Sequence, residues 1–150
     1  MIRPATMEDI DTLLDLAEEF YALTDMADIY SFNRKSTRFL LKAFIETPDA
    51  VLLVAEIEGC VIGGIGGQLM PATYNFDKKM MFENFWFIGN DYRGKCNPLK
   101  MLKAFEKASK DLGACMILMG AYHHLKFNAL TALYGKAGYS PTETIFIKEI

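Results

Sequence analysis

The chain has 150 residues, of which 51% are hydrophobic and 23% charged, and its formal net charge is -3. This length and composition fit one domain over residues 1–150, and they exclude a disordered or collagen-like chain. Glycines and Pro71 interrupt the longest uncharged run, so we expect no segment that spans a membrane. The amino terminus lacks the apolar core of a secretory signal, which indicates a cytoplasmic protein.

Charge is distributed unevenly along the chain. Residues 1–92 contain 7 Lys and Arg against 15 Asp and Glu, whereas residues 93–150 contain 9 against 4. One domain can therefore present an acidic region to a cationic ligand and a basic region to an anionic one. A solvated surface with unevenly placed charge explains the same counts equally well. Cys60, Cys96 and Cys115 are far apart and form no C-x-x-C pair, which favours reduced thiols over disulfides or a zinc site.

The first fifty residues predict a short strand at Ile2–Arg3 and two amphipathic helices. Thr6 is placed to cap the first helix, whose apolar residues recur at helical spacing. Ser36 is expected to cap the second helix, and Pro48 to end it near Thr47. The outer face of the first helix carries six carboxylates: Glu8, Asp9, Asp11, Asp15, Glu18 and Glu19.

The next segment changes to the patterns of β-strands. Val51–Ile57 and Cys60–Met70 are apolar runs on either side of a Glu58–Gly59 turn, which predicts a hairpin. The glycines at 63–67 have no helix start behind them, so a phosphate-binding loop is disfavoured. A strand that bends, or that lets another backbone come close, is preferred. Met80–Ile88 predicts a third, aromatic-rich strand.

The remaining residues predict alternating helices and strands, which gives an α/β layout with no internal repeat. Asn97 as cap and Pro98 at the first helical position predict a helix that Gly113 ends. Three further elements are expected: a strand over Ala114–Gly120, a helix over Asn128–Ala137 and a last strand over Thr144–Ile150.

The segment between the aromatic strand and the Asn97 helix is suited to an anion. A helix amino terminus carries unpaired N–H donors and about half a positive charge, so it can bind a phosphate. Arg93 and Lys95 flank Gly94 in the preceding turn and strengthen such a site. Many turns of this kind nevertheless carry a basic residue without binding a ligand.

The run from Glu83 to Lys95, followed by Asn128, Tyr134 and Gly138-Tyr139, resembles the GNAT superfamily of acyl-CoA-dependent N-acetyltransferases. The likeness covers nearly the whole chain and looks closest to the compact GNAT-like proteins of bacteriophages and prophages. It implies an α/β fold with a mixed central sheet of six to seven strands, flanked by about four helices. The sheet would be splayed to receive the pantetheine arm of acetyl-CoA.

The resemblance also implies which residues contact the cofactor. The turn would hold the pyrophosphate, and the amide of Ile88 would polarise the thioester carbonyl. Tyr134 matches the tyrosine that protonates the CoA sulfur in this family, although a tyrosine here is also an ordinary core residue. The implied cofactor-binding residues are Trp86, Ile88, Arg93, Gly94, Lys95, Cys96, Asn97, Leu99 and Asn128. No metal is implied.

Two residues of the turn depart from the family pattern, which usually reads R-G-x-G-x-G or R-G-x-G-x-A. Cys96 adds a side chain where glycine lets the backbone approach a phosphate, and Pro98 removes one N–H donor. A missing hydrogen bond to a charged group costs roughly 1.5 to 3 kcal/mol, or about one to two decades in affinity. We therefore expect cofactor binding at reduced strength.

Direct acetyl transfer needs a general base, and Glu83 is the candidate. Strand alternation places Glu83 on one face with Phe85 and Phe87 unless a bulge intervenes, and aromatic surroundings would raise its pKa. A rim carboxylate, or a structural partner of Arg93, is an equally good interpretation.

His123 or His124 is an alternative base, although a plain loop pair explains the two histidines better, and neighbours that point apart in an extended segment would not share a metal. The aromatic strand has no interleaved basic residues, so core packing is favoured over nucleic-acid stacking.

The sequence therefore predicts an N-acetyltransferase that transfers acetyl from acetyl-CoA to a primary amine by direct transfer in a ternary complex. The acidic first helix and the stretch with Asp25 and Asp28 lie where this family builds its acceptor entrance, which favours a cationic small-molecule or protein amine as acceptor. No nucleic-acid or membrane partner is expected. The resemblance also allows a homodimer, because small GNAT-like domains with exposed apolar residues on their last strands often pair. Two other hypotheses stay open: a GNAT-like protein that has lost catalysis and serves as a binding or virion-associated component, and a module that binds basic proteins.

Overall fold

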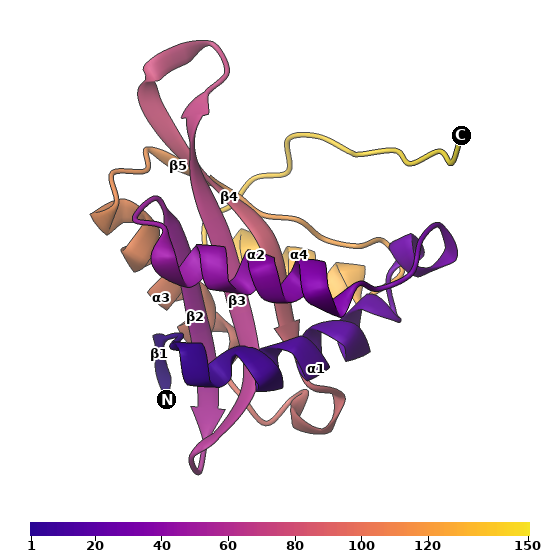
Figure 1. The fold of residues 1–150 in the computed structure, drawn as a ribbon. Helices are drawn as coiled ribbons and strands as arrows, with labels where there is room; N and C mark the ends of the chain where they lie inside the picture. The colour runs from indigo at the N-terminus through magenta and orange to yellow at the C-terminus, as the bar shows by residue number, and fades with distance from the viewer.

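A mixed five-stranded sheet forms the centre of the computed structural model, which describes residues 1–150 (Figure 1). The strands lie side by side in chain order. The pairs β1–β2, β2–β3 and β3–β4 are antiparallel, whereas β4 and β5 are parallel. Their bounds are Ile2–Pro4 for β1, Ala50–Ile57 for β2, Cys60–Ala72 for β3, Asn75–Ile88 for β4 and Met116–Leu118 for β5.

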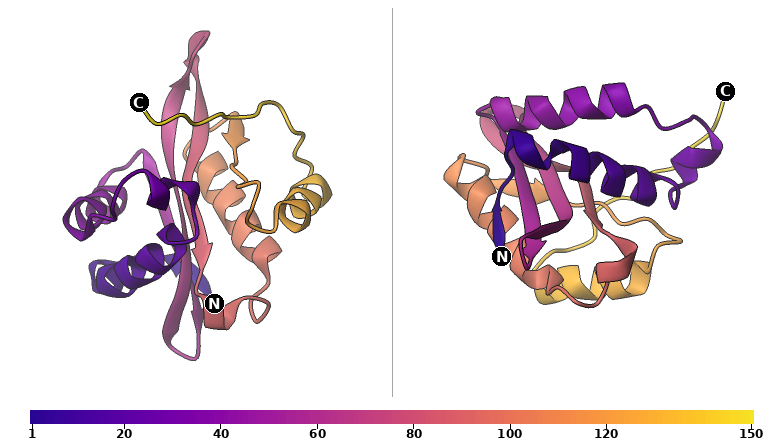
Figure 2. Two further views of the ribbon diagram at one scale, coloured as in Figure 1. Left: turned by 90° about the vertical axis from the view of Figure 1, so that its right-hand side faces the viewer. Right: turned by 60° about the horizontal axis from the view of Figure 1, so that its bottom comes forward.

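Two pairs of helices cover the two faces of the sheet (Figure 2). α1 (Ile10–Tyr21) and α2 (Arg34–Glu46) lie on one face, and α3 (Pro98–Asp111) and α4 (Phe127–Lys136) on the other. No helix is both long and apolar enough to cross a membrane. Short 3-10 turns complete the connections: η1 (Met7–Asp9), η2 (Asp25–Asp28) and η3 (Asn90–Tyr92).

Apolar side chains form two cores, one on each face of the sheet. Leu13, Leu14 and Leu41 pack between the α1–α2 pair and the sheet, while Met101 and Phe105 pack α3 against the other face. Each of these side chains is almost fully buried, and burial of such a side chain contributes about 1.5 to 3 kcal/mol.

Local capping signals fix where the helices begin. The Thr6 amide donates to the Asp9 carboxylate at 2.8 Å, and Asp9 also accepts two hydrogen bonds from Arg3 of β1. The Arg3 guanidinium holds the pKa of Asp9 below its usual value. The prediction that Ser36 caps the second helix was wrong: Asn33 is the cap, its side chain accepts the Ser36 amide, and α2 begins three residues earlier than expected.

The predicted hairpin of β2 and β3 is confirmed, and its Glu58–Gly59 turn has positive φ at both residues. The glycines of β3 lie where other groups come close. A Cβ at Gly67 would lie 2.9 Å from the Phe82 carbonyl oxygen of β4 and 2.5 Å from the buried Phe105 ring. The interpretation of this segment as a strand that admits another backbone closely is therefore correct.

Four helices are present as expected, but the sheet has five strands rather than six to seven. β4 begins at Asn75 instead of Met80, and β5 is confined to Met116–Leu118. The last strand predicted over Thr144–Ile150 does not form. That segment has the composition of a strand, but a strand is stable only beside a hydrogen-bonding neighbour, and none lies along it.

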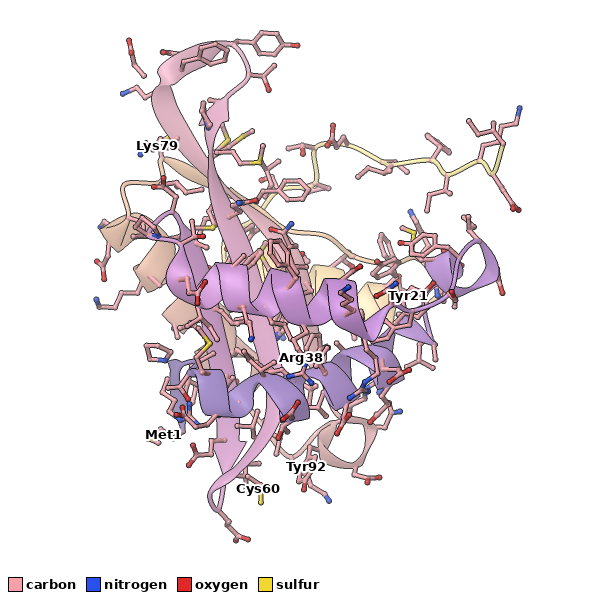
Figure 3. The ribbon with its side chains drawn as sticks, in the orientation of Figure 1. Met1, Tyr21, Arg38, Cys60, Lys79 and Tyr92 are labelled. Atoms are coloured by element: carbon pink, nitrogen blue, oxygen red, sulfur yellow. The ribbon has the colours of Figure 1, made fainter.

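Most of the acidic face of α1 is paired with α2. Arg34 bonds Asp15 and Glu18, and Arg38, which lies between the two helices in Figure 3, bonds Asp11. Each pair is solvent-exposed, so it contributes little to stability.

We predict opposite effects for two glycine substitutions. Gly67→Ala should lower the free energy of unfolding by about 1 to 3 kcal/mol, because its Cβ would overlap the Phe82 carbonyl and the Phe105 ring. Gly135→Ala, inside α4 and with nothing within 4 Å of the new Cβ, should raise it by up to about 1 kcal/mol. Denaturant titration measures both, and a tolerated Gly67→Ala would contradict the close approach.

Candidate active site

The candidate site lies where β4 and β5 stop pairing. The two strands are paired over only three residues, Met80–Phe82 with Met116–Leu118. Beyond this point β4 continues to Ile88 without a backbone partner on the β5 side. The next link across the gap is made by a side chain: the Gly120 amide donates to the Glu83 carboxylate at 2.9 Å.

Tyr134, a residue of α4, also contacts Gly120. Its hydroxyl donates to the Gly120 carbonyl at 2.8 Å, so one residue of the post-β5 segment holds both candidate catalytic side chains. Tyr134 is only 8% exposed, and its ring centroid lies 6.3 Å from that of Trp86. The sequence analysis did not identify Gly120, because a glycine at the end of a predicted strand gives no chemical signal.

Burial sets the protonation of both groups. The pKa of Glu83 is raised to about 7 because burial disfavours the carboxylate, and the hydrogen bond from Gly120 opposes this only in part. Burial, and then the Glu83 carboxylate, raises the pKa of Tyr134 above its usual value of 10.0. Near neutral pH, Glu83 can therefore accept a proton while Tyr134 still carries one.

The expected common face of Glu83, Phe85 and Phe87 is wrong. The register skips one residue of β4, Asn84, because Phe85 pairs with Gly66 and Glu83 pairs with the next residue of β3. This bulge reverses the alternation. Phe85 and Phe87 accordingly pack toward α1 and α2, whereas the Glu83 carboxylate reaches across to Gly120.

Tyr122 is a site residue that sequence reasoning missed. It is half-buried, packs edge-on against Phe20 at 6.1 Å between centroids, and also lies against His124. Its pKa is raised by burial and then by the carboxylates of Glu83 and, more weakly, Asp25. Tyr122 lies beside the η2 segment through His124, which contacts both Tyr122 and Asp25.

The two histidines point to different neighbours. His124 Nε2 lies 2.7 Å from the Leu23 carbonyl oxygen and its Nδ1 lies 3.3 Å from Asp25, while the His123 ring stacks on Phe127. Neither ring is hydrogen-bonded to Glu83 or Tyr134. No group of three or more His, Cys, Asp or Glu side chains is arranged to hold a metal ion.

The candidate pyrophosphate turn is exposed and only partly free to bind an anion. The Asn97 side chain accepts the Leu99 amide at 3.0 Å, and Pro98 at the first position of α3 has no amide proton. The amides of Gly94, Cys96 and Asn97 make no hydrogen bond to another backbone group.

The basic residues of the turn have weak partners of their own. Arg93 does not pair with Glu83; its Nε donates to the Ile88 carbonyl at 3.3 Å. Lys95 lies 5.5 Å from the centroid of the Tyr92 ring. The Cys96 side chain packs partly against the core, and Asn128 is exposed in the first turn of α4 without a side-chain hydrogen bond.

The acidic helix also braces this turn. Glu19 of α1 accepts the Asn90 amide at 2.6 Å, at the start of the loop that leads to Arg93. Glu18 and Glu19 are thus both engaged in structural contacts.

No protein-family model and no curated protein sequence matches this chain. Solved structures do match over their whole length. A glucosamine-6-phosphate N-acetyltransferase from Arabidopsis thaliana aligns over 99% of this chain and 96% of its own, with 16% identity and a TM-score of 0.73. A GNAT family acetyltransferase from Staphylococcus aureus aligns over 100% and 98%, with 21% identity and a TM-score of 0.69.

An aminoglycoside acetyltransferase from an uncultured soil sample, solved with sisomicin, aligns over 100% of this chain and 95% of its own, with 15% identity and a TM-score of 0.72. At these identities the likeness is one of fold. The chain has the fold of the GNAT acetyltransferases, with fewer strands than the sequence analysis expected.

We predict that Glu83→Gln changes the pH dependence of stability. Below pH 4.5 Glu83 is protonated in both states; as the pH rises through 7, the unfolded state ionises first and the folded state loses stability. Gln keeps an acceptor for the Gly120 amide and does not titrate. The variant should therefore be more stable than the parent at pH 8, by on the order of 1 to 3 kcal/mol, and nearly equal at pH 4.

Denaturant titrations at the two pH values measure this difference. Glu58→Gln, in the exposed β2–β3 turn, is the control and should show no dependence on pH. An equal effect of Glu83→Gln at both pH values would show that burial does not shift the Glu83 pKa.

Proposed function

We propose that this chain transfers the acetyl group of acetyl-CoA to a primary amine, by direct transfer in a ternary complex. One observation carries the proposal: Gly120 holds a carboxylate of raised pKa and a protonated tyrosine together, where β4 and β5 separate. The fold shared with acetyltransferases supports the same class of reaction.

The cofactor would enter through the gap between β4 and β5. Its pyrophosphate would meet the amides of Gly94, Cys96 and Asn97, with Arg93 and Lys95 beside them. Trp86 and Ile88 would line the pantetheine arm, and Leu99 and Asn128 would flank it. The remaining donors fit a pyrophosphate. Because the Leu99 amide already donates to Asn97, we expect weaker binding than in a turn where that amide is free.

The two candidate catalytic residues have complementary tasks. Glu83 would take a proton from the acceptor ammonium, so that the neutral nitrogen forms a bond to the acetyl carbonyl carbon. Tyr134 would leave the Gly120 carbonyl and give its proton to the sulfur as the carbon–sulfur bond breaks. The nitrogen, now bonded to carbon, loses its second proton to solvent as the carbon–sulfur bond breaks, so the products are the neutral N-acetylated amine and CoA. Glu83 then releases its proton to solvent and Tyr134 regains one, which leaves a net release of one proton.

We further propose that the acceptor is cationic. Fewer carboxylates than the charge count suggested can attract it. Asp11, Asp15 and Glu18 already have arginine partners. Asp25 has only His124 beside it, at 3.3 Å, and the carboxylates of Glu83 and Asp25 both contribute to the raised pKa of the Tyr122 hydroxyl. A primary ammonium beside Tyr122 would meet both carboxylates and an aromatic ring.

A second candidate function is a GNAT-like binding or virion-associated protein without catalysis. The observation that favours it is the α3 amino terminus, where Asn97 and Pro98 remove two amide donors from the cofactor turn. This alternative and the enzyme differ in one measurable property, which is whether the chain binds acetyl-CoA.

We predict that the parent protein binds CoA and that Pro98→Ala tightens binding by about tenfold, because it adds one amide donor to a charged ligand. Pantetheine, which lacks the pyrophosphate, is the matched ligand and should bind the two proteins equally. Titration calorimetry measures both. Absence of CoA binding in both proteins would favour the non-catalytic alternative, and an equal gain for pantetheine would refute the role of this turn.

We also predict that Tyr134→Phe lowers kcat by about a hundredfold or more and leaves the dissociation constant of acetyl-CoA nearly unchanged. The parent rate should rise with pH through about 7 as Glu83 ionises, and Glu83→Gln should be slow and lack this rise. CoA release with a panel of primary amines, including polyamines and amino-terminal peptides, supplies the assay.

Tyr139→Phe is the matched control for Tyr134, because its ring lies 5.5 Å from that of Tyr134 but its hydroxyl has no contact with Gly120. It should keep the parent rate. Full activity of both Tyr134→Phe and Glu83→Gln would place the catalytic groups elsewhere.

A further inference from the structure

The ring of His124 faces two hydrogen-bond acceptors at once. Its Nε2 lies 2.7 Å from the Leu23 carbonyl oxygen, and its Nδ1 lies 3.3 Å from the Asp25 carboxylate. A carbonyl and a carboxylate accept hydrogen bonds and donate none, whereas a neutral imidazole carries an N–H on one nitrogen only. Both contacts are satisfied together only when both ring nitrogens carry a proton. His124 therefore meets this pair of acceptors as a positively charged imidazolium.

The imidazolium is the cation that pairs with Asp25, which has no lysine or arginine partner. The Asp25 side chain is 61% exposed, so a ligand can still reach it. Tyr122 lies edge-on against the other side of the His124 ring, with 6.0 Å between centroids. After burial, Glu83 of β4 and Tyr30 raise the pKa of Tyr122, and they complete the set of titratable groups around this pair. None of these neighbours is a second cation.

We propose that His124 takes the place of the acceptor's ammonium group at Asp25 and competes with the acceptor for that carboxylate. The inference rests on the proposed function, in which a cationic amine binds beside Tyr122. One carboxylate can neutralise either the imidazolium or the ammonium, and two cations beside it repel each other. The acceptor therefore binds more weakly while His124 is protonated, and loss of the His124 proton releases Asp25 to the acceptor.

This competition makes the affinity for a cationic acceptor depend on pH. Imidazole is the side chain that ordinarily changes charge between about pH 5 and 8. A primary ammonium keeps its charge over the same range, because an amine like that of lysine titrates at about 10.4. Affinity should therefore rise with pH as the imidazolium loses its proton. Glu83 ionises in the same range and acts in the same direction, so variants must separate the two contributions.

The test is calorimetric titration of the full chain, with CoA present, at pH 5.5 and pH 8. Putrescine, a dication, is the probe, and butane-1,4-diol is its neutral counterpart. His124→Gln keeps an N–H donor for the Leu23 carbonyl and carries no charge. At pH 5.5 this variant should bind putrescine about two- to fivefold more tightly than the parent, and at pH 8 the two proteins should bind it equally. The diol should bind both proteins equally at either pH.

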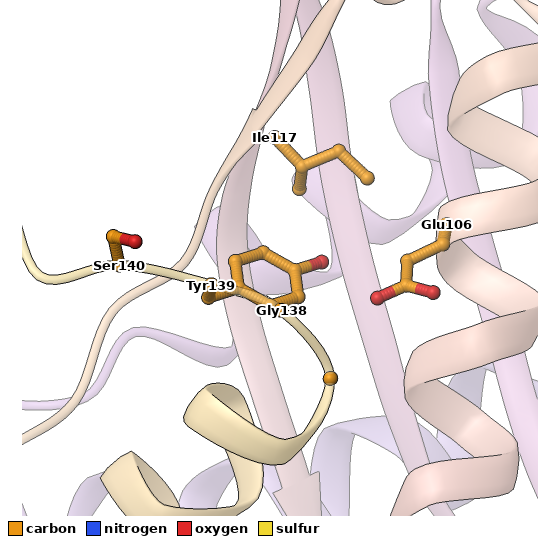
Figure 4. Close-up of a pocket in the computed structure, with 6 residues that line it drawn as sticks. Glu106, Ile117, Gly138, Tyr139 and Ser140 are labelled. Atoms are coloured by element: carbon orange, nitrogen blue, oxygen red, sulfur yellow. The ribbon is translucent and has the colours of Figure 1, made fainter.

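Two control variants separate this effect from other losses of charge. His123→Gln is matched to His124→Gln, because the His123 ring stacks on Phe127 and faces neither acceptor. Glu106→Gln tests binding elsewhere, because the Glu106 carboxylate lines a pocket of about 410 Å³ beside Tyr139 on the other face of the sheet (Figure 4). Both controls should bind putrescine as the parent does.

Asp25→Asn tests whether the competition takes place at this carboxylate. It should weaken putrescine binding at pH 8, and in its background His124→Gln should no longer tighten binding at pH 5.5. In the active enzyme, His124→Gln should lower KM for putrescine at pH 5.5 and leave kcat unchanged, because His124 contacts the acceptor's carboxylate and neither candidate catalytic residue.

Equal affinities of the parent and His124→Gln at pH 5.5 would overturn the proposal. The same gain in His123→Gln, a gain that persists beside Asp25→Asn, or no putrescine binding at either pH would overturn it as well. The proposed function can fail separately. If putrescine binds with the expected pH dependence but no amine releases CoA from acetyl-CoA, the competition at Asp25 stands and acetyl transfer is refuted.

Discussion

The short pairing between β4 and β5 is the constraint on which the rest of the structure depends. Parallel strands normally continue side by side, but here three residue pairs are followed by a bulge at Asn84 that turns β4 out of register. The backbone groups of the post-β5 segment must then find other partners, because buried polar groups are seldom left unpaired. Glu83 and Tyr134 supply two of those partners at Gly120, so the gap in the sheet organises the candidate site.

The sequence predicted the features that local chemistry determines. The Glu58–Gly59 turn, the Asn97–Pro98 helix start and the Gly113 stop each depend on a few neighbouring residues, and all three lie where expected. The sequence-based predictions were wrong where contacts between distant segments determine the structure. The bulge at Asn84 arises from the pairing of β4 with β3. No nearby residue type indicates that the side chains before and after it alternate differently. Thr144–Ile150 has strand composition, yet strand formation needs an adjacent edge that composition does not encode.

The candidate site shows the same division. Glu83 and Tyr134 could be selected as candidates from their chemistry and from the resemblance. That both side chains hydrogen-bond Gly120 could not be predicted, because it depends on tertiary structure. Charge counts misled in a related way. The acidic face of α1 resembled a surface for cations, whereas Arg34 and Arg38 of α2 already pair with much of it. A count of charges along the chain cannot distinguish a carboxylate that is free to bind a cationic ligand from one that already forms an ion pair within the protein.

A longer β5 would remove both the candidate site and the open edge. If β5 paired with β4 as far as Ile88, backbone hydrogen bonds would close the gap, and Glu83 would no longer be the link to Gly120. The same extension would give the outer edge of β5 enough length to pair with the segment after Tyr139 in its own chain. A three-residue β5 therefore leaves a polar gap on its inner side and an unsatisfied edge on its outer side. On the inner side, burial raises the pKa of Glu83, so the gap that the short strand leaves also sets the protonation of the candidate base.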